Sequence, residues 1–428
     1  MGDIMFEKDR LFAKKLDEKD DLRKFREEFY LNPGEIYMDG NSLGLMSKPA
    51  EKAVHRMLEE WKTLGIRGWL DAKKPWYYYS EELAKGLAPL LGASPEEITV
   101  HGSTTINIHN LISTMYQPTE KKYKILIDNL NFPTDRYAIE SFLKLQGKSL
   151  ETHLKVVESE DGSTLKEDTI ISHMTSDVAL ILLPSVLYRS GQLLDIEKLT
   201  KAAHERNIII GFDCSHSAGV VNHKLSDHGV DFAMWSNYKY LNNGPGGASG
   251  LYLNKRHFNR PVGLEGWFGS TKEKQFDLDD HLTPSNDASR LEIGTPNLLS
   301  MAPLEGSLEI FNKAGIDNIR RKSINITEYL IYLIDEYLTE FGFEIGSPRE
   351  SSHRGGHVAL LHDEAIRINE ALKDEGIVPD FRKPNVIRLA PVPLYISYEE
   401  VFDVVMALKR IMTEEKYKKY DKKRSVVA

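Results

Sequence analysis

The two stretches that decide the fold are IIIGFDCSHSAG at residues 208–219 and SNYKYLNNGPGG at residues 236–247. In the first, an apolar run ends at Asp213, which predicts a buried strand with a carboxylate at its carboxyl end. In the second, Lys239 stands between Tyr238 and Tyr240 and is followed by glycines. An apolar, tightly turning environment of this kind helps a lysine to lose its proton. Asp213 and Lys239 are therefore the first candidates for chemistry.

This pair of residues is typical of an enzyme that uses pyridoxal 5'-phosphate. The cofactor accepts electrons well only while its ring nitrogen is protonated, and Asp213 can keep it so. The amine of Lys239 can hold the cofactor aldehyde as a Schiff base. Each residue also has an ordinary explanation, because a strand-end Asp can cap a helix and most lysines are surface charges.

Composition limits the classes of function. The chain has 428 residues, 41% of them apolar, and a net charge of -9, so we expect two domains and no nucleic-acid partner. No apolar stretch is long enough to cross a bilayer, and the first residues lack the apolar core of a secretion signal, which predicts a cytoplasmic protein without a membrane partner. The single cysteine, Cys214, excludes an intramolecular disulfide and a multi-thiolate metal site, and we expect no metal.

The pattern along the chain predicts an α/β fold. We expect an N-terminal helix over 3–30 within an arm of residues 1–45, a large cofactor-binding domain over 46–300, and a small α+β domain over 301–428 that begins with a linking helix at 301–324. Apolar runs without alternation predict a mostly parallel seven-stranded sheet covered by helices on both faces. These runs lie at 98–100, 124–128, 155–157, 179–183, 207–213, 232–235 and 250–253. In the small domain we expect strands at 343–345, 357–361 and 386–389 and helices at 363–375 and 398–412.

Other residues could complete a cofactor site. Thr104 and Thr105 begin a helix after a strand, where hydroxyls and free amides bind phosphate or simply cap the helix. Phe132 could stack on a planar cofactor or belong to the core. His216 could contact Asp213 or the cofactor, or be structural. Arg388 interrupts an apolar strand, so it needs a carboxylate partner, either from an amino-acid substrate or from a structural Asp or Glu.

The chain resembles the kynureninase family of fold-type-I pyridoxal-phosphate hydrolases over nearly its whole length. The motifs that carry the resemblance are IYMDGNSLG (36–44), FPTD (132–135), GFDCSHSAG (211–219), GVDFAMWSNYKYLN (229–242), GWFG (266–269) and IRLAPVPLY (387–395). The resemblance implies hydrolysis of L-kynurenine, or its 3-hydroxy form, to anthranilate or 3-hydroxyanthranilate and L-alanine, in tryptophan catabolism or NAD biosynthesis. It also implies a homodimer with shared active sites.

Site residues follow from the resemblance position by position. Lys239 would carry the cofactor, Asp213 would partner its ring nitrogen, and Tyr238 would transfer protons. The other implied cofactor contacts are Thr104, Thr105, Phe132, Pro133, Thr134, Asp135, His216, Trp267 and Thr295. Of these, Trp267 and Thr295 would come from the neighbouring subunit of the homodimer. Arg388 would bind the substrate carboxylate.

One departure and two rival functions remain. Pro184 stands where the family usually has a Ser or Thr beside the cofactor, so either Ser185 replaces that contact or it is absent. A cysteine desulfurase or selenocysteine lyase shares the early chemistry, but it needs a mobile catalytic cysteine. A pyridoxal-phosphate-sensing regulator would need a DNA-binding module, for which the N-terminal segment is too short and too acidic.

The loop GIRGWL (65–70) and Thr295 resemble the bacterial type of the family, which favours kynurenine over its 3-hydroxy form.

Overall fold

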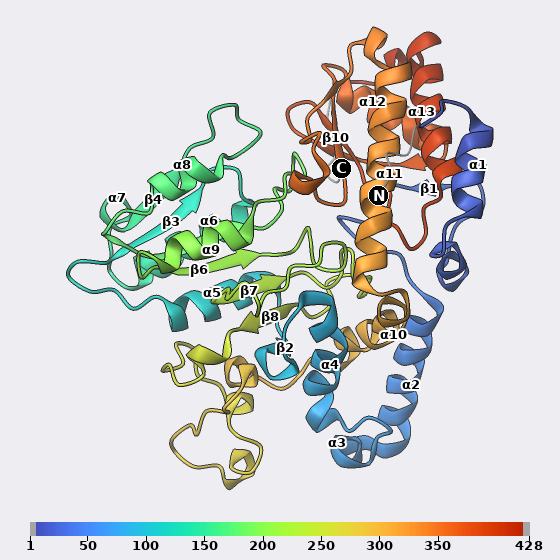
Figure 1. Cartoon of the computed structure of the whole chain (residues 1–428). Coiled ribbons are helices and arrows are strands. Elements are labelled where there is room, and N and C mark those ends of the chain that lie inside the picture. Colours follow the sequence, from blue (N-terminus) through green and yellow to red (C-terminus); the bar gives the residue numbers. More distant parts are fainter. Residues whose placement is uncertain (1–5, 423–428) are drawn as a thin grey trace.

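The main element of the protein is a seven-stranded sheet (Figure 1). The computed structural model describes residues 6–422, so the predictions for residues 3–5 lie outside it. The strands follow the order β2-β8-β7-β6-β5-β3-β4, and only β8 runs antiparallel to its neighbours. Their bounds are β2 (Ile98–Val100), β3 (Lys124–Asp128), β4 (Leu154–Val157), β5 (Val178–Pro184), β6 (Ile209–Asp213), β7 (Phe232–Trp235) and β8 (Gly250–Leu253). The prediction of a mostly parallel seven-stranded sheet is confirmed.

Helices cover both faces of this sheet because its central strands are apolar on both sides. Along β5, Leu180 and Leu182 belong to one apolar cluster, whereas Ile181 and Leu183 belong to a second. The first cluster includes residues of α5 and α6, and the second includes residues of α8 and α9. The helices on or beside the sheet are α5 (Thr104–Met115), α6 (Pro133–Leu145), α7 (Leu150–His153), α8 (Glu167–Ser172) and α9 (Ile196–His204).

A second, smaller sheet forms the C-terminal part of the protein, drawn in orange and red in Figure 1. Its order is β12-β13-β10-β9, and all its pairings are antiparallel. The bounds of its elements are β9 (Glu344–Ile345), β10 (Val358–Leu361), β12 (Asp380–Arg382), β13 (Val386–Leu389), α12 (Ala365–Asp374) and α13 (Tyr398–Thr413). The strands predicted at 343–345, 357–361 and 386–389 are present, and β12 is an addition that the sequence pattern did not predict.

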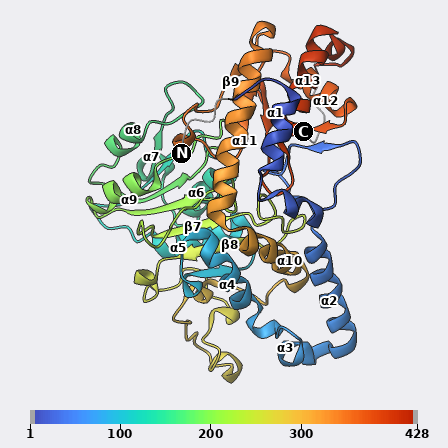
Figure 2. The ribbon, with the colours of Figure 1, turned by 45° about the vertical axis from the view of Figure 1, so that its right-hand side comes forward.

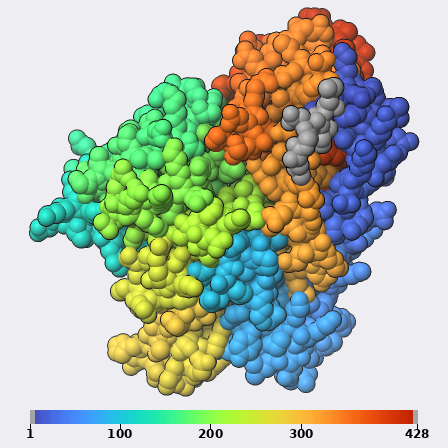
Figure 3. All heavy atoms as spheres, viewed as in Figure 1, coloured from blue at the N-terminus to red at the C-terminus, as the bar shows by residue number. Residues whose placement is uncertain are grey.

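The N-terminal segment packs on the small domain, and in Figure 3 its blue atoms lie beside the orange and red atoms of the C-terminal part. Strand β1 (Ile36–Tyr37) pairs in parallel with β11 (Ile377–Val378), and α1 (Arg10–Glu18) packs on α13. The single helix predicted over 3–30 is wrong, because α1 ends at Glu18 and only a short 3-10 helix, Arg23–Glu28, follows. Two acidic residues near the end of α1 have tertiary partners: Asp17, in its last turn, accepts hydrogen bonds from the first backbone amides of α13, and Asp20, just after it, pairs with Lys322.

The predicted linking helix over 301–324 is two helices, α10 (Leu298–Ala314) and α11 (Ile316–Tyr337), and the second runs the length of the small domain (Figure 2). Gly315 separates them with a φ of +77°, a conformation that favours glycine. Helix α10 packs closely on α2 (Lys48–Leu64). Gly306 allows this approach, because a Cβ atom at that position would lie 2.2 Å from the Pro49 backbone. It also contacts α4 (Tyr79–Leu91) of the large domain, whereas α11 packs against α13. The domain boundary at residue 300 therefore stays a prediction.

Two further segments bear on the site and on assembly. The short helix α3 (Gly68–Asp71) follows α2, and residues 255–295 contain only short 3-10 helices and project beyond the sheet (yellow in Figure 1). Within the described residues, we find no helix long and apolar enough to cross a membrane.

Candidate active site

A cavity of about 630 Å³ lies where the carboxyl edge of the large sheet faces the small domain. Strands β2, β3, β6 and β7 all end at this edge, because they run parallel to one another in one sheet. The small sheet contributes Arg382 and Arg388, and the N-terminal segment contributes Ser42. The cavity is therefore built by three stretches of chain that are distant in sequence.

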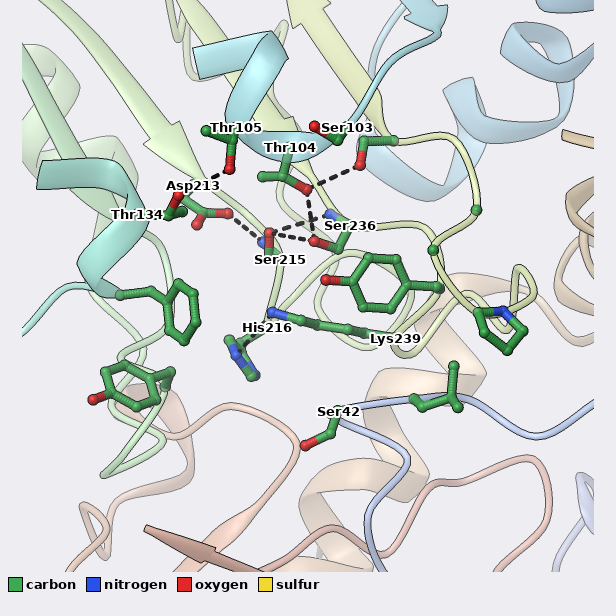
Figure 4. A pocket seen from close by; sticks show the side chains of 18 of the residues that line it. Ser42, Ser103, Thr104, Thr105, Thr134, Asp213, Ser215, His216, Ser236 and Lys239 are labelled. Atoms are coloured by element: carbon green, nitrogen blue, oxygen red, sulfur yellow. Dashed lines mark hydrogen bonds between the residues drawn. The ribbon is translucent and has the colours of Figure 1, made fainter. Parts of the chain in front are cut away.

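Hydroxyl groups cluster at the amino-terminal end of α5 (Figure 4). The Thr104 hydroxyl lies 2.7 Å from that of Ser236 and 2.9 Å from that of Ser249. The Thr105 hydroxyl lies 2.8 Å from that of Thr134, at the start of α6. Helix amino termini carry unpaired backbone amides and a partial positive charge, so this cluster can bind a phosphate group.

Lys239 points into the cavity toward His216, with 3.1 Å between the lysine Nζ and His216 Nε2 (Figure 4). Burial lowers the pKa of Lys239 to about 8, although the Asp213 carboxylate opposes this shift. Burial also lowers the pKa of His216 well below its ordinary value, as does the nearby positive charge of Lys239. His216 is therefore neutral at physiological pH and can accept a hydrogen bond from the lysine.

Asp213 ends β6 and lines the cavity, where its Oδ1 accepts a hydrogen bond from the Ser215 amide at 2.8 Å. Asp135 is buried behind it, and neither carboxylate oxygen of Asp135 has a hydrogen-bond partner. Burial raises the pKa of Asp135 well above its ordinary value, and the neighbouring Asp213 raises it further. Because Asp213 lines the cavity, its carboxylate can bind a protonated nitrogen there.

Arg388 lines the cavity from β13 and is 1% exposed. The structural carboxylate that the sequence left open as its partner is present, because Asp380 on β12 pairs with it. Nη1 of Arg388 also donates to the Tyr188 carbonyl and Nη2 to the Ser42 hydroxyl, each at 2.8 Å. This finding leaves the predicted substrate contact of Arg388 untested.

The cavity brings together most of the residues that the sequence predicts. Those that line it are Thr104, Thr105, Phe132, Thr134, Asp213, His216, Tyr238, Lys239 and Arg388. Pro133 is the first residue of α6 and Asp135 lies below the surface, so neither lines the cavity. Trp267 and Thr295 lie outside this chain's own cavity, and their contribution to a partner's site stays a prediction.

Sequence reasoning missed several residues that line the cavity. They are Ser42, Leu43, Ser103, Tyr188, Ser215, Ser236, Pro245, Gly246, Gly247, Ser249 and Arg382. Ser103, Ser215 and Ser236 stand next to or close to predicted residues, so their positions at strand ends were a usable signal. Tyr188 and Arg382 had no comparable signal, because only folding brings them to the cavity.

Ser185 follows Pro184, which stands where the family usually has a Ser or Thr beside the cofactor. Ser185 is fully buried, and its hydroxyl lies 2.6 Å from that of Ser217 and 3.2 Å from the carbonyl oxygen of Asp213. It does not line the cavity, so its hydroxyl gives no replacement for the missing family contact. Cys214 is also fully buried, and burial raises the pKa of its thiol to about 12.

The residues present fit pyridoxal 5'-phosphate. The hydroxyl cluster with the α5 amino terminus suits the phosphate, and Asp213 suits the ring nitrogen. The ring of Phe132 lies 5.8 Å from Lys239 Nζ and is 39% exposed, so one face is available for stacking. The lysine amine, with its lowered pKa, suits the aldehyde.

Comparison with solved structures gives the class of the fold. A cysteine desulfurase from Thermococcus onnurineus matches with a TM-score of 0.77 and 20% identity, over 92% of this chain and 98% of that one. A C-DES variant with glycine covalently linked to its PLP cofactor matches with a TM-score of 0.76 and 16% identity, over 90% and 98% of the two chains. The protein therefore has the fold of the fold-type-I pyridoxal-phosphate enzymes.

Comparison with curated proteins identifies the family. The chain is 56% identical to a kynureninase from Geobacillus thermodenitrificans and 55% identical to one from Bacillus anthracis, in each case over 97% of both chains. Residues 319–408 match the family model of the kynureninase C-terminal domain. The chain belongs to the kynureninase family, which confirms the resemblance found in the sequence.

Proposed function

We propose that this protein is a pyridoxal-phosphate-dependent hydrolase that converts L-kynurenine, or its 3-hydroxy form, to L-alanine and the corresponding anthranilate. The observation that carries the proposal is the Lys239 amine, with its pKa lowered to about 8, in one cavity with Asp213 and the hydroxyl cluster at α5. Family membership over 97% of the chain supports the same activity. When bound, pyridoxal phosphate supplies an aldehyde and a ring that accepts electrons from the substrate carbons.

Lys239 has the central role in moving protons. With the cofactor bound, the Lys239 amine would hold its aldehyde and, when free, would take the proton from the substrate α-carbon. Its lowered pKa makes the neutral amine available near physiological pH. His216, neutral and 3.1 Å away, holds the amine in place.

Tyr238 and the arginines act on the rest of the substrate. Water adds to the γ-carbonyl carbon, and the bond between the β and γ carbons then breaks to give alanine and the aromatic acid. Tyr238 lines the cavity and can give a proton to the carbonyl oxygen during this addition. Arg388 binds the substrate carboxylate from the small-domain side.

A cysteine desulfurase activity is the weaker alternative. The solved structures that match include such enzymes, but at no more than 20% identity they bear on the fold alone. That reaction needs a mobile, ionisable thiol, whereas the single thiol of this chain is buried with a pKa raised to about 12. This observation supports carbon–carbon bond hydrolysis over sulfur transfer.

We further propose that the protein acts as a homodimer with shared active sites. An apolar surface supports it, formed by Ile66, Leu70, Trp267 and Phe276, which are 79%, 66%, 44% and 68% exposed. A contiguous apolar surface of this kind is unusual on a monomer and typical of subunit interfaces. Trp267 at this surface and Thr295 would then contact the cofactor of the neighbouring subunit. The cytoplasmic location stays a prediction.

Steady-state kinetics test the proposed activity. The cofactor-loaded enzyme should release anthranilate, followed by its fluorescence, from L-kynurenine, and comparison of kcat/KM for the 3-hydroxy form gives the preference. The loop GIRGWL (65–70) and Thr295 predict a preference for L-kynurenine. L-Cysteine serves as the rival substrate, and sulfide release without anthranilate release would overturn the proposal.

A further inference from the structure

Residues 266–295 carry both Trp267 and Thr295, and the two ends of this segment pack directly on each other. A Cβ atom at Gly266 would lie 1.8 Å from the carbonyl oxygen of Ile293. The backbone beside Trp267 is therefore in direct contact with the backbone two residues before Thr295. Whatever holds the second end of the segment in place also holds Trp267.

Glu292 anchors this segment in the interior of the large domain. Of the acidic residues at 266–295, Glu292 alone is buried, with 1% of its surface exposed. Its Oε1 lies 2.5 Å from the hydroxyl of Thr99 on β2, and that hydroxyl lies 2.8 Å from the hydroxyl of Ser80 on α4. Its Oε2 is also buried and has no hydrogen-bond partner among residues 6–422. One carboxyl group thus joins the segment to a strand and a helix of the large domain.

The charges around Glu292 favour its neutral form. In the described part of the chain, the charged groups that face it are Glu81 of α4 and Lys272 of its own segment. Lys272 Nζ lies 3.4 Å from Glu81 Oε1, so its positive charge already serves another carboxylate. An ionised Glu292 would be a buried charge without full compensation. Burial, and then the charge of Glu81, therefore raise the pKa of Glu292 to about 7, against the opposing effect of Lys272.

A proton on Glu292 also completes a chain of hydrogen bonds. The Ser80 hydroxyl lies 3.3 Å from the carbonyl oxygen of Val100 on β2. When Glu292 is neutral, it donates to Thr99, Thr99 donates to Ser80, and Ser80 donates to this carbonyl, so each hydroxyl has an acceptor. When Glu292 is ionised, it can only accept, the chain runs the other way, and the Val100 carbonyl loses the Ser80 proton. The hydrogen bonds and the charges thus favour the same neutral state.

We propose that Glu292 is a positioning residue whose proton holds residues 266–295 on β2 and α4, and that its ionisation at rising pH loosens Trp267 and Thr295. The inference rests on the proposed function, because these two residues are expected to contact the cofactor of the neighbouring subunit. A free glutamate has a pKa of 4.5, whereas burial and Glu81 raise that of Glu292 to about 7. The contribution of Glu292 is therefore complete below pH 4.5 and is lost as the pH rises through 7.

Hydrogen–deuterium exchange in the cofactor-loaded enzyme measures how firmly residues 266–295 are held. Wild type is compared with Glu292→Gln, whose amide is neutral at every pH, so that the intrinsic pH dependence of exchange cancels. The wild-type-to-variant ratio of exchange rates in this segment should rise about 10- to 100-fold from pH 5 to pH 8, because a pKa shift from 4.5 to about 7 acts over this range. Peptides from the rest of the chain should show no such rise.

Two further variants separate the role of the proton from a change of shape. Glu81→Gln leaves Lys272 free to pair with Glu292, so the rise should be several-fold smaller, and this variant tests the inference without altering Glu292. Glu273→Gln, at an exposed carboxylate of the same segment, is the matched control and should keep the full wild-type rise. A constant ratio from pH 5 to pH 8, a rise spread over all peptides, or a full rise in Glu81→Gln would overturn the inference.

Cofactor affinity connects the segment to the site. Relative to Glu292→Gln, the affinity of wild type for pyridoxal phosphate, followed by absorbance, should weaken about fivefold or more from pH 5 to pH 8. Lys239 is the same in both proteins, so its own titration cancels. An unchanged relative affinity would show that Glu292 does not position a cofactor contact. Failure of the wild-type enzyme to cleave L-kynurenine would instead count against the proposed function, because neither measurement requires turnover.

Discussion

At the scale of single residues, the environment of Lys239 decides the reactivity of the site. An exposed lysine is almost entirely protonated at neutral pH, whereas burial lowers the pKa of Lys239 from 10.5 to about 8. The neutral histidine beside it accepts a hydrogen bond without adding a charge. A neutral amine is the nucleophilic form, so the folded chain activates this lysine before any substrate arrives.

This lowered pKa gives a prediction for the cofactor-free protein. Its rate of covalent linkage to added pyridoxal phosphate, followed by absorbance, should rise with pH to a midpoint near 8, because raising the pH removes the proton from the attacking amine. Lys239→Ala should show no linkage that borohydride can fix, whereas Lys62→Ala, at an exposed lysine, should behave as wild type. A midpoint near 10.5, or a fixed label on another lysine, would contradict the assignment.

Residue by residue, the sequence predicted the site best where chemistry is encoded locally. Asp213 and Lys239 could be found because each stands in a short motif next to its own strand. Tyr188 could not, because it meets Arg388 across 200 positions of sequence only after the small domain has folded onto the large one. Asp380 meets Arg388 where β12 pairs with β13 in the small sheet.

At the scale of elements, one buried carboxylate ties three helices together. Glu305 on α10 bonds Arg56 of α2 at 2.5 and 2.6 Å, Tyr79 of α4 at 2.6 Å and Lys74 at 3.0 Å. Burial alone would raise the pKa of Glu305, but these partners outweigh burial and lower it from 4.5 to about 2. Helices α2, α4 and α10 are thus joined by a charge that must stay ionised.

Removal of this charge should destabilise the protein in a pH-dependent way. A folded pKa below the unfolded one contributes stability that is present above pH 4.5 and lost as the pH falls toward 2. Glu305→Gln should therefore lower the free energy of unfolding by about 2 to 3 kcal/mol at pH 7 and by clearly less at pH 3.

Urea denaturation at the two pH values measures the effect of Glu305→Gln. Glu309→Gln, at an exposed position of the same helix, is the control and should have little effect at either pH. An equal loss at pH 7 and pH 3 would show that the carboxylate matters for its shape rather than for its charge.

The elements themselves were predicted unequally well. Each of the seven long apolar runs became a strand of the large sheet, because burial on both faces leaves a pattern that few other structures produce. The helices expected over 3–30 and 301–324 had the right periodicity but the wrong extent, because tertiary contacts of Asp17 and Asp20 end the first near residue 18 and Gly315 divides the second. Strand β12 has no apolar run, because a charged residue stands on each side of Phe381.

At the scale of the whole molecule, the shared active site can be tested by mixing subunits. Lys239→Ala and Trp267→Ala should each be poorly active alone. If Trp267 serves the neighbouring subunit, the mixed dimer has one intact site of two, so the separated mixed dimer should have about half of the wild-type activity. Activity on L-kynurenine, measured after separation of the mixed dimer by two affinity tags, checks this. No gain over the parent variants would mean that Trp267 acts within its own chain or not at all.

The sequence by itself determined the class of sheet and the family, and it predicted Lys239 and Asp213 as the cofactor lysine and its aspartate, because strand burial and short motifs are properties of neighbouring residues. Only the tertiary structure decided which partners hold Arg388 and that Ser42, Tyr188 and Arg382 line one cavity. These features depend on the large sheet, the small sheet and the N-terminal segment meeting at one place. Burial where these three parts of the chain meet sets the pKa values and the free hydrogen-bond donors, and no local sequence pattern predicts them.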